Sequence, residues 1–241
     1  MHFTKTAALL AAVVLTLAGC ASVPPEIPYD RTTAGTIHTI GVLTEGYPSG
    51  GPSAILAANL GASFGLIGGI TEGIMRSNRE SSLRDIMASQ NFRFENEFNA
   101  TLLQAIAAHG YQVVTVPVGR EQGNKLFDKY PANFEVAADA YLDIAVNDYG
   151  YIAAAISDSA PYRPFMSARV KLVRASDKAV LMQDIIIYNP YNNPKNAVTI
   201  SSDPAYSYTT FDMLEGDRTG TVTGLKIAAD QSAAAVANLL R

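Results

Sequence analysis

The side chains that most often carry acid–base or metal chemistry are scarce in this chain. It has three histidines, His2, His38 and His109, and one cysteine, Cys20. A Ser-His-Asp triad or a histidine-based metal site would have to use His38 or His109, because His2 lies in a predicted targeting segment. His109 stands at the end of a predicted helix, where the helix dipole favours a cation. We therefore expect no catalytic residues, no metal site and no cofactor.

Two carboxylates, Asp139 and Asp143, share one face of a predicted strand. Four residues of strand separate them by roughly 13 Å, which exceeds the spacing of about 5 to 9.5 Å in a glycosidase pair. We expect them to pair instead with Arg169 or Lys171 of a neighbouring strand. The chain also lacks the G-x-S-x-G, H-E-x-x-H, P-loop and dinucleotide motifs. The sequence therefore predicts a protein that is not an enzyme.

Cys20 is the residue whose surroundings indicate a specific modification. Residues 1–19 carry Lys5 near their start, then an apolar run and small residues, which is typical of an export signal. Leu17-Ala18-Gly19-Cys20 resembles the lipobox of bacterial lipoproteins, in which the signal is cut before the cysteine and the thiol receives a lipid. The resemblance implies lipidation of Cys20. The alternative is an ordinary secretory signal in which this cysteine is incidental.

The residues around the predicted lipid suggest where the protein resides. Ala21, rather than an aspartate, follows Cys20, and the resemblance then implies release to the outer membrane, with the domain facing the periplasm. Residues 20–35 contain three prolines and predict an extended spacer, which leaves residues 36–241 as one periplasmic domain. The chain has 18 basic and 22 acidic residues. Because a mildly acidic protein gains nothing from counterion release, we expect no nucleic-acid partner.

A small residue stands at every fourth position over a long apolar stretch. These residues are Ser53, Ala57, Gly61, Gly65, Gly69, Gly73, Ser77 and Ser81. Because residues four apart share a helix face, we predict a glycine-rich apolar helix over residues 53–76. Its packing interface would be formed by Ala57, Gly61, Gly65, Gly69 and Gly73. Each helical glycine costs about 1 kcal/mol relative to alanine, and close backbone approach would offset that cost.

Three environments for this segment remain open. It is long enough, at 22 residues from Ala54 to Met75, to span a bilayer as a helix. The first environment is packing within the protein or against another copy, and the second is contact with a membrane or a pore. The third is a glycine-rich loop.

The remaining patterns predict an α/β (α+β) fold. Strands are expected at 36–43 and 111–118, and a helix from 82 to 109 lies between them. Alternating residues predict an antiparallel meander at 139–151, 163–174 and 179–188, and a closing helix is expected from about 219 to 240. A short helix is also expected around 123–130. We predict a mixed sheet of about five strands with the helices packed on one face and the closing helix beside the earlier one.

The first meander strand predicts one core face and one wet face. The expected core residues are Ala140, Leu142, Ile144 and Val146, and the expected wet residues are Asp139, Tyr141, Asp143, Asn147, Tyr149 and Tyr151. Residues 189–217 predict a long loop rich in aromatic side chains. A candidate partner surface on it consists of Tyr191, Tyr206, Tyr208 and Phe211. Alternatively, these rings fasten the loop to the sheet.

The order of strand, helix, strand, meander and closing helix on a lipidated chain is similar to envelope-assembly lipoproteins of the curli-secretion, exopolysaccharide-export and peptidoglycan-synthase-activator families. We expect a non-catalytic outer-membrane lipoprotein that acts as an interaction or assembly module in cell-envelope biogenesis or export. Its partners would be the membrane, other envelope proteins or copies of itself. The alternative is a periplasmic carrier or sensor of lipid or another apolar ligand, held between the sheet and the apolar helix.

Overall fold

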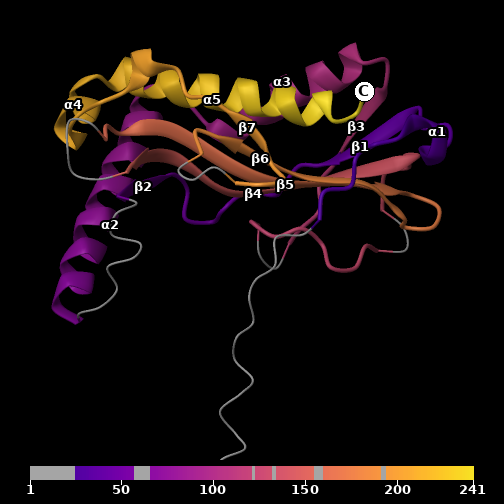
Figure 1. Cartoon of the computed structure of the whole chain (residues 1–241), viewed down its shortest axis with the longest axis horizontal. Coiled ribbons are helices and arrows are strands. Elements are labelled where there is room, and N and C mark those ends of the chain that lie inside the picture. The colour runs from indigo at the N-terminus through magenta and orange to yellow at the C-terminus, as the bar shows by residue number, and fades with distance from the viewer. Residues whose placement is uncertain (1–24, 57–65, 121–122, 132–133, 155–159, 191–193) are drawn as a thin grey trace, which may run out of the picture.

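The computed structural model describes residues 25–56, 66–120, 123–131, 134–154, 160–190 and 194–241. They form a twisted sheet with helices α3 and α5 laid side by side across one face (Figure 1). The strands are β1 (Thr39–Leu43), β2 (Ser53–Leu56), β3 (Gln112–Val116), β4 (Ala140–Ala153), β5 (Arg163–Arg174), β6 (Val180–Tyr188) and β7 (Val198–Ile200). The helices are α1 (Arg31–Ala34), α2 (Leu66–Ser89), α3 (Phe94–Ala108), α4 (Phe211–Gly216) and α5 (Arg218–Asn238), with a 3₁₀ turn at Pro204–Tyr206.

The sheet is mixed, as expected. Its strand order in the described residues is β3-β1-β4-β5-β6-β7, with β2 paired to the far end of β4. The pairs β4–β5 and β5–β6 are antiparallel, which confirms the predicted meander. The pairs formed by β1, β2 and β3 are parallel, as is β6–β7. Among the described residues the sheet has seven strands rather than about five, because β2 and β7 were not anticipated.

The core lies between the sheet and the pair α3–α5. Phe94, Phe98, Leu102 and Ile106 are the buried residues of α3, at the helical spacing that the sequence predicts. Opposite them, α5 contributes mostly small buried residues, including Ala229 and Ala233, which allows the two helices to approach closely. The closing helix is therefore confirmed, both in its extent and in its place beside α3.

The helices before α3 differ from the prediction in three ways. Residues Ser53–Leu56 are strand β2 and not the start of a helix, because they pair with β4. α2 runs unbroken through residues 76–82, where a break was expected. The predicted helix over 82–109 is divided, since Asn91 adopts a positive φ of 51° between α2 and α3. The short helix expected around 123–130 is wrong as well, because the described residues there form turns.

A β-bulge at Asn147 changes which side of β4 faces the helices. The register between β4 and β5 shifts between Val146 and Asp148. Beyond that point the alternation is inverted, so Tyr149 and Tyr151 join the core on the helix side, where Tyr149 stacks on Phe94 at a centroid distance of 4.1 Å. The prediction that these two tyrosines lie on a wet face is therefore wrong.

The other sheet face is also partly covered. Leu43, Val116 and Tyr141 form a second buried cluster there, under residues of the connection between β3 and β4. Gly41 provides room for the Tyr141 ring, because a Cβ at this position would lie 2.8 Å from the ring. Tyr141 and Asp143, expected on a wet face, are thus buried as well.

Two segments reach the sheet from the side opposite α3 and α5 (Figure 1). Residues 25–27 approach it there, and Ile27 exchanges two main-chain hydrogen bonds with Gln183 of β6, at 2.8 and 2.9 Å. Part of the predicted spacer is therefore fastened to the sheet edge. The N-terminal turns of α2 extend well past the sheet on the same side. Among the helices of the described chain, none is both long and apolar enough to cross a membrane.

Candidate functional site

The C-terminal half of α2 fixes this helix to the domain. Arg79, Leu83 and Ile86 are buried, and the helix contacts β2, α4 and α5. The Arg79 guanidinium donates a hydrogen bond to the Tyr162 hydroxyl over 3.4 Å. Sequence reasoning missed Arg79, although its spacing to Leu83 and Ile86 places the three residues on one helix face.

Charged groups gather where α2 meets the sheet. Arg76 and Glu80 form an ion pair at 2.7 Å along the helix. Nearby, burial raises the pKa of the Asp148 carboxyl, and a hydrogen bond from the Ser53 hydroxyl partly opposes this shift. The bulge next to Asp148 thus directs an acidic group toward the root of α2.

The small-residue face of α2 points away from the domain wherever its side chains are described. Ser77 and Ser81 are exposed, as is Met75, which keeps 46% of its surface. Gly69 and Gly73 precede them at four-residue intervals in the same helix and continue the same face. The other predicted interface residues, Ala57, Gly61 and Gly65, lie outside the described residues, as does Cys20. We call Gly69, Gly73, Ser77 and Ser81 the small-residue face of α2.

The aromatic residues after β7 mostly contact the domain itself. Tyr208 is buried, and its hydroxyl donates to Asp217 over 2.9 Å. Phe211 is half-buried and packs edge-on against Tyr162, with ring centroids 5.6 Å apart. Tyr206 is half-buried beside Gly224 of α5, and Tyr191 lies outside the described residues. Tyr208 is therefore a core residue rather than part of a partner surface, whereas contact roles for Tyr206 and Phe211 stay predictions.

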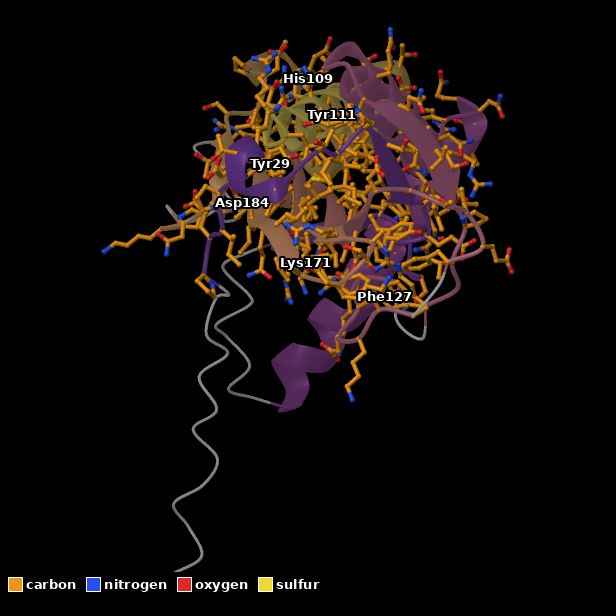
Figure 2. The ribbon with its side chains drawn as sticks, turned by 90° about the vertical axis from the view of Figure 1, so that its right-hand side faces the viewer. Tyr29, His109, Tyr111, Phe127, Lys171 and Asp184 are labelled. Carbon is orange, nitrogen blue, oxygen red and sulfur yellow. The ribbon has the colours of Figure 1, made fainter. Side chains whose placement is uncertain are left out.

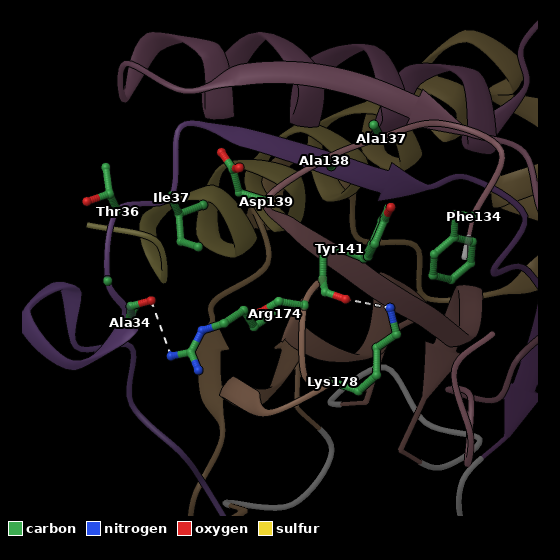
Figure 3. A pocket seen from close by; sticks show the side chains of 13 residues that line it. Ala34, Thr36, Ile37, Phe134, Ala137, Ala138, Asp139, Tyr141, Arg174 and Lys178 are labelled. Carbon is green, nitrogen blue, oxygen red and sulfur yellow. Dashed lines mark hydrogen bonds between the residues drawn. The ribbon is translucent and has the colours of Figure 1, made fainter. Parts of the chain in front are cut away.

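The most voluminous of the described cavities lies at the end of the sheet, beside the β5–β6 hairpin (Figure 3). Its volume is about 630 Å³. Charged groups come from Asp139, Arg174 and Lys178, and aromatic rings come from Phe134 and Tyr141. This combination of charges and rings could hold a small polar molecule if the charges were available.

The charges of this cavity already have structural partners. The Asp139 carboxylate accepts hydrogen bonds from the main-chain N–H groups of His38 and Thr39, both at 2.8 Å, and these bonds lower its pKa. Arg174 donates to the Ala34 carbonyl and Lys178 to the Ala175 carbonyl (dashed lines in Figure 3). The predicted pairing of Asp139 with Arg169 or Lys171 is wrong, because this carboxylate caps the start of β1.

Asp143 is the centre of a buried cluster on the sheet face opposite the helices. It forms an ion pair with Arg120 at 2.7 Å and accepts hydrogen bonds from the Phe127 N–H and the Tyr130 hydroxyl, both at 2.9 Å. The Arg120 guanidinium also lies over the Phe127 ring. Lys171, expected to pair with Asp143, instead lies 5.8 Å from the centroid of the Tyr130 ring (Figure 2). This cluster fastens the β3–β4 connection to the sheet.

The two described histidines differ in their surroundings, since His38 adjoins the Asp139 carboxylate and His109 lies beside a cavity without an acid. His109 lines a cavity of about 190 Å³ beside Tyr29 and Tyr111, whose lining residues include Arg31 but no acid (Figure 2). His38 is part of none of the described cavity linings, and its main-chain N–H bonds Asp139. Within the described ranges, no three His, Cys, Asp or Glu residues could together hold a metal ion.

The space between the sheet and α3–α5 is filled by protein side chains. Leu102 of α3 and Val170 of β5 are both buried in the core without measurable exposure, and the described cavities lie elsewhere. The first turns of α2 project past the sheet, and Met75 and Ser77 are exposed where the side chains of this half are described (Figure 1). Comparison of the chain with protein-family models, with curated proteins and with solved structures found no match.

Proposed function

We propose that this protein is a non-catalytic lipoprotein of the outer membrane that serves as an interaction or assembly module in cell-envelope biogenesis or export. Its contact element would be the small-residue face of α2. The observation that carries the proposal is that this face leaves the domain, with Ser77 and Ser81 exposed to solvent.

Glycine in a helix has an energetic cost that suggests a partner. Each of Gly69 and Gly73 costs about 1 kcal/mol relative to alanine in a helix. A face without side chains lets a second helix approach until the backbones touch, and the resulting van der Waals contact offsets this cost. A second copy of α2 presents the same face, so a symmetric contact between two copies fits these residues.

A lipid on Cys20 would assist such an assembly. Several acyl chains hold a protein durably at a membrane, because each buried CH₂ contributes about 0.8 kcal/mol. Molecules confined to one surface meet at a much higher effective concentration than in solution. A contact of modest affinity between copies of α2 is then sufficient for the protein to assemble.

The alternative is a carrier that holds lipid or another apolar ligand between the sheet and the apolar helix, which is the region of α2. The tight packing of α3 and α5 on the sheet does not test this alternative, because the ligand would lie against a different helix. Native mass spectrometry of the extracted protein separates the two functions. A recurrent bound lipid with a monomeric protein would favour the carrier, whereas a defined oligomer favours the module.

The double substitution Gly69→Leu/Gly73→Leu tests the contact directly. Leucine side chains on this face would keep two backbones apart, so we expect chemical cross-linking in intact membranes to yield monomers where the unaltered protein yields oligomers. Gly216→Leu is the matched control, because Gly216 has open space around its Cβ position and an ordinary φ. Unchanged oligomers in a double variant of full stability would rule out this contact.

A further inference from the structure

Two segments of the molecule point toward the same side of the sheet. The start of the described chain, at residues 25–27, and the first turns of α2 both lie toward the side opposite α3 and α5, and the two perpendicular views agree on this (Figures 1 and 2). The N-terminal segment is held at the sheet edge by the pairing of Ile27 with Gln183. Any group attached to Cys20 is therefore tethered to that edge of the domain.

The tether and the helix have nearly the same reach. Seven residues separate Cys20 from Ile27, and at full extension they span at most about 25 Å. Thirteen residues separate Leu66 from Arg79, the first buried residue of α2 whose side chain is described. At a rise of 1.5 Å per residue they span about 20 Å. The tether is therefore long enough for a membrane that holds a lipid on Cys20 to lie at the end of α2.

The residues at that end suit an apolar surface. In the ten residues from Leu66 to Met75, Glu72 is the only charged one. Contact of these ten residues with lipid would therefore be apolar rather than electrostatic, because the one charge among them is acidic.

We propose that the first turns of α2, beginning at Leu66, enter the leaflet that holds the lipid on Cys20. The inference rests on the proposed lipid anchor, and it locates the small-residue contact between copies at the membrane surface. Two fixed points, the acylated N-terminus and the end of α2, then set the orientation of the sheet above the bilayer. A bilayer is the occupant that the tether favours, because a lipid on Cys20 would hold the leaflet on this side of the sheet and within reach of the end of α2.

Tryptophan fluorescence tests the proposal, because the chain contains no tryptophan. Single variants Ile67→Trp, Met75→Trp and Met213→Trp of the full lipidated protein would be reconstituted into vesicles containing brominated phospholipid. Met213 is the matched control, since it is 55% exposed and belongs to α4 on the helix side of the sheet. Interfacial helices bury their apolar face about 5 to 10 Å into the boundary, so we expect bromine to remove roughly half of the Ile67→Trp emission.

The remaining variants and conditions complete the test. Quenching should be weaker for Met75→Trp and absent for Met213→Trp, and it should not change between low and high salt. Vesicle flotation of the same samples, with Cys20→Ser beside them, reports the anchor separately. The inference would be overturned if the protein floats only when Cys20 is present and the Ile67→Trp emission is the same with and without bromine. That result would leave the lipid anchor intact. If the protein with Cys20 intact fails to float with the vesicles, the proposed lipid anchor itself is overturned.

Discussion

The Arg120 guanidinium and the Asp143 carboxylate form an ion pair 2.7 Å apart in which 3% and 0% of the two side chains remain exposed. Removing one partner leaves a buried charge without its counter-charge. We therefore expect Arg120→Leu to lower the free energy of unfolding by about 3 to 5 kcal/mol. Urea denaturation would measure this loss.

The double variant Arg120→Leu/Asp143→Leu completes a thermodynamic cycle. It should lose less stability than the sum of the two single variants, because neither charge is then stranded. Part of the loss will persist, since the Phe127 N–H and the Tyr130 hydroxyl also lose their acceptor. Strict additivity of the two single effects would show that the pair has no energetic coupling.

Asp139→Asn should lower the free energy of unfolding at pH 7 by about 1 kcal/mol, a modest value because the group is solvent-exposed. The hydrogen bonds from Thr39 and His38 hold the pKa of this carboxyl below its unfolded value. Its contribution is therefore present above the unfolded pKa and is lost as the pH falls through the folded pKa. Denaturation of both proteins between pH 7 and 2 should show their curves converging in acid.

Asp148→Asn should have the opposite effect. Burial raises the pKa of Asp148 in the folded state, so its ionised form opposes folding at neutral pH. That cost vanishes as the pH falls below the unfolded pKa. We expect the variant to raise the Tm at pH 7 and to have no advantage near pH 3. Asp177→Asn is a useful comparison, because the pKa of Asp177 is lowered by hydrogen bonding from Ala179 and its loss should not stabilise the protein.

Gly150→Ala should disrupt the attachment of β2. Gly150 has a φ of +144°, and a Cβ there would lie 2.0 Å from the Ser53 carbonyl oxygen. The backbone strain and the atomic overlap together predict that the free energy of unfolding falls by about 3 kcal/mol. Gly119→Ala is the matched control, because Gly119 has open space and an ordinary φ. Hydrogen exchange should show faster exchange in β2 for the first variant alone, and equal rates would contradict the expected overlap.

Local patterns were sufficient to predict much of the fold. Strands β5 and β6 and helix α3 each bury one face, so their apolar residues recur at a fixed spacing in the sequence. This spacing is visible in β5 and β6 and in Phe94, Phe98 and Leu102 of α3. The predicted meander and closing helix therefore agree with the structure. The glycine-rich apolar helix predicted over residues 53–76 is not confirmed, because Ser53–Leu56 form β2 and the observed helix α2 runs from Leu66 to Ser89.

The remaining features depend on contacts that no local pattern encodes. The bulge at Asn147 inverts the alternation of β4 by a single residue, so Tyr149 and Tyr151 read as outward-facing although they are core residues. Ser53–Leu56 became a strand because β4 continues past the bulge and offers an edge to pair with. The partners of Asp139 and Asp143 come from outside the neighbouring antiparallel strand, for example His38 and Arg120. The sequence of that strand therefore could not be used to predict them.

The pairing of Ile27 with Gln183 has a mechanical consequence. Tension applied to the N-terminal end of the chain is borne first by the hydrogen bond from the Gln183 side-chain amide to the Pro25 carbonyl and by two main-chain hydrogen bonds between Ile27 and Gln183 at the edge of β6. These bonds can open by peeling while the helix-covered core stays intact. The edge pairing therefore acts as a weak link in series with the domain, which would lengthen the tether under load before any part of the core yields.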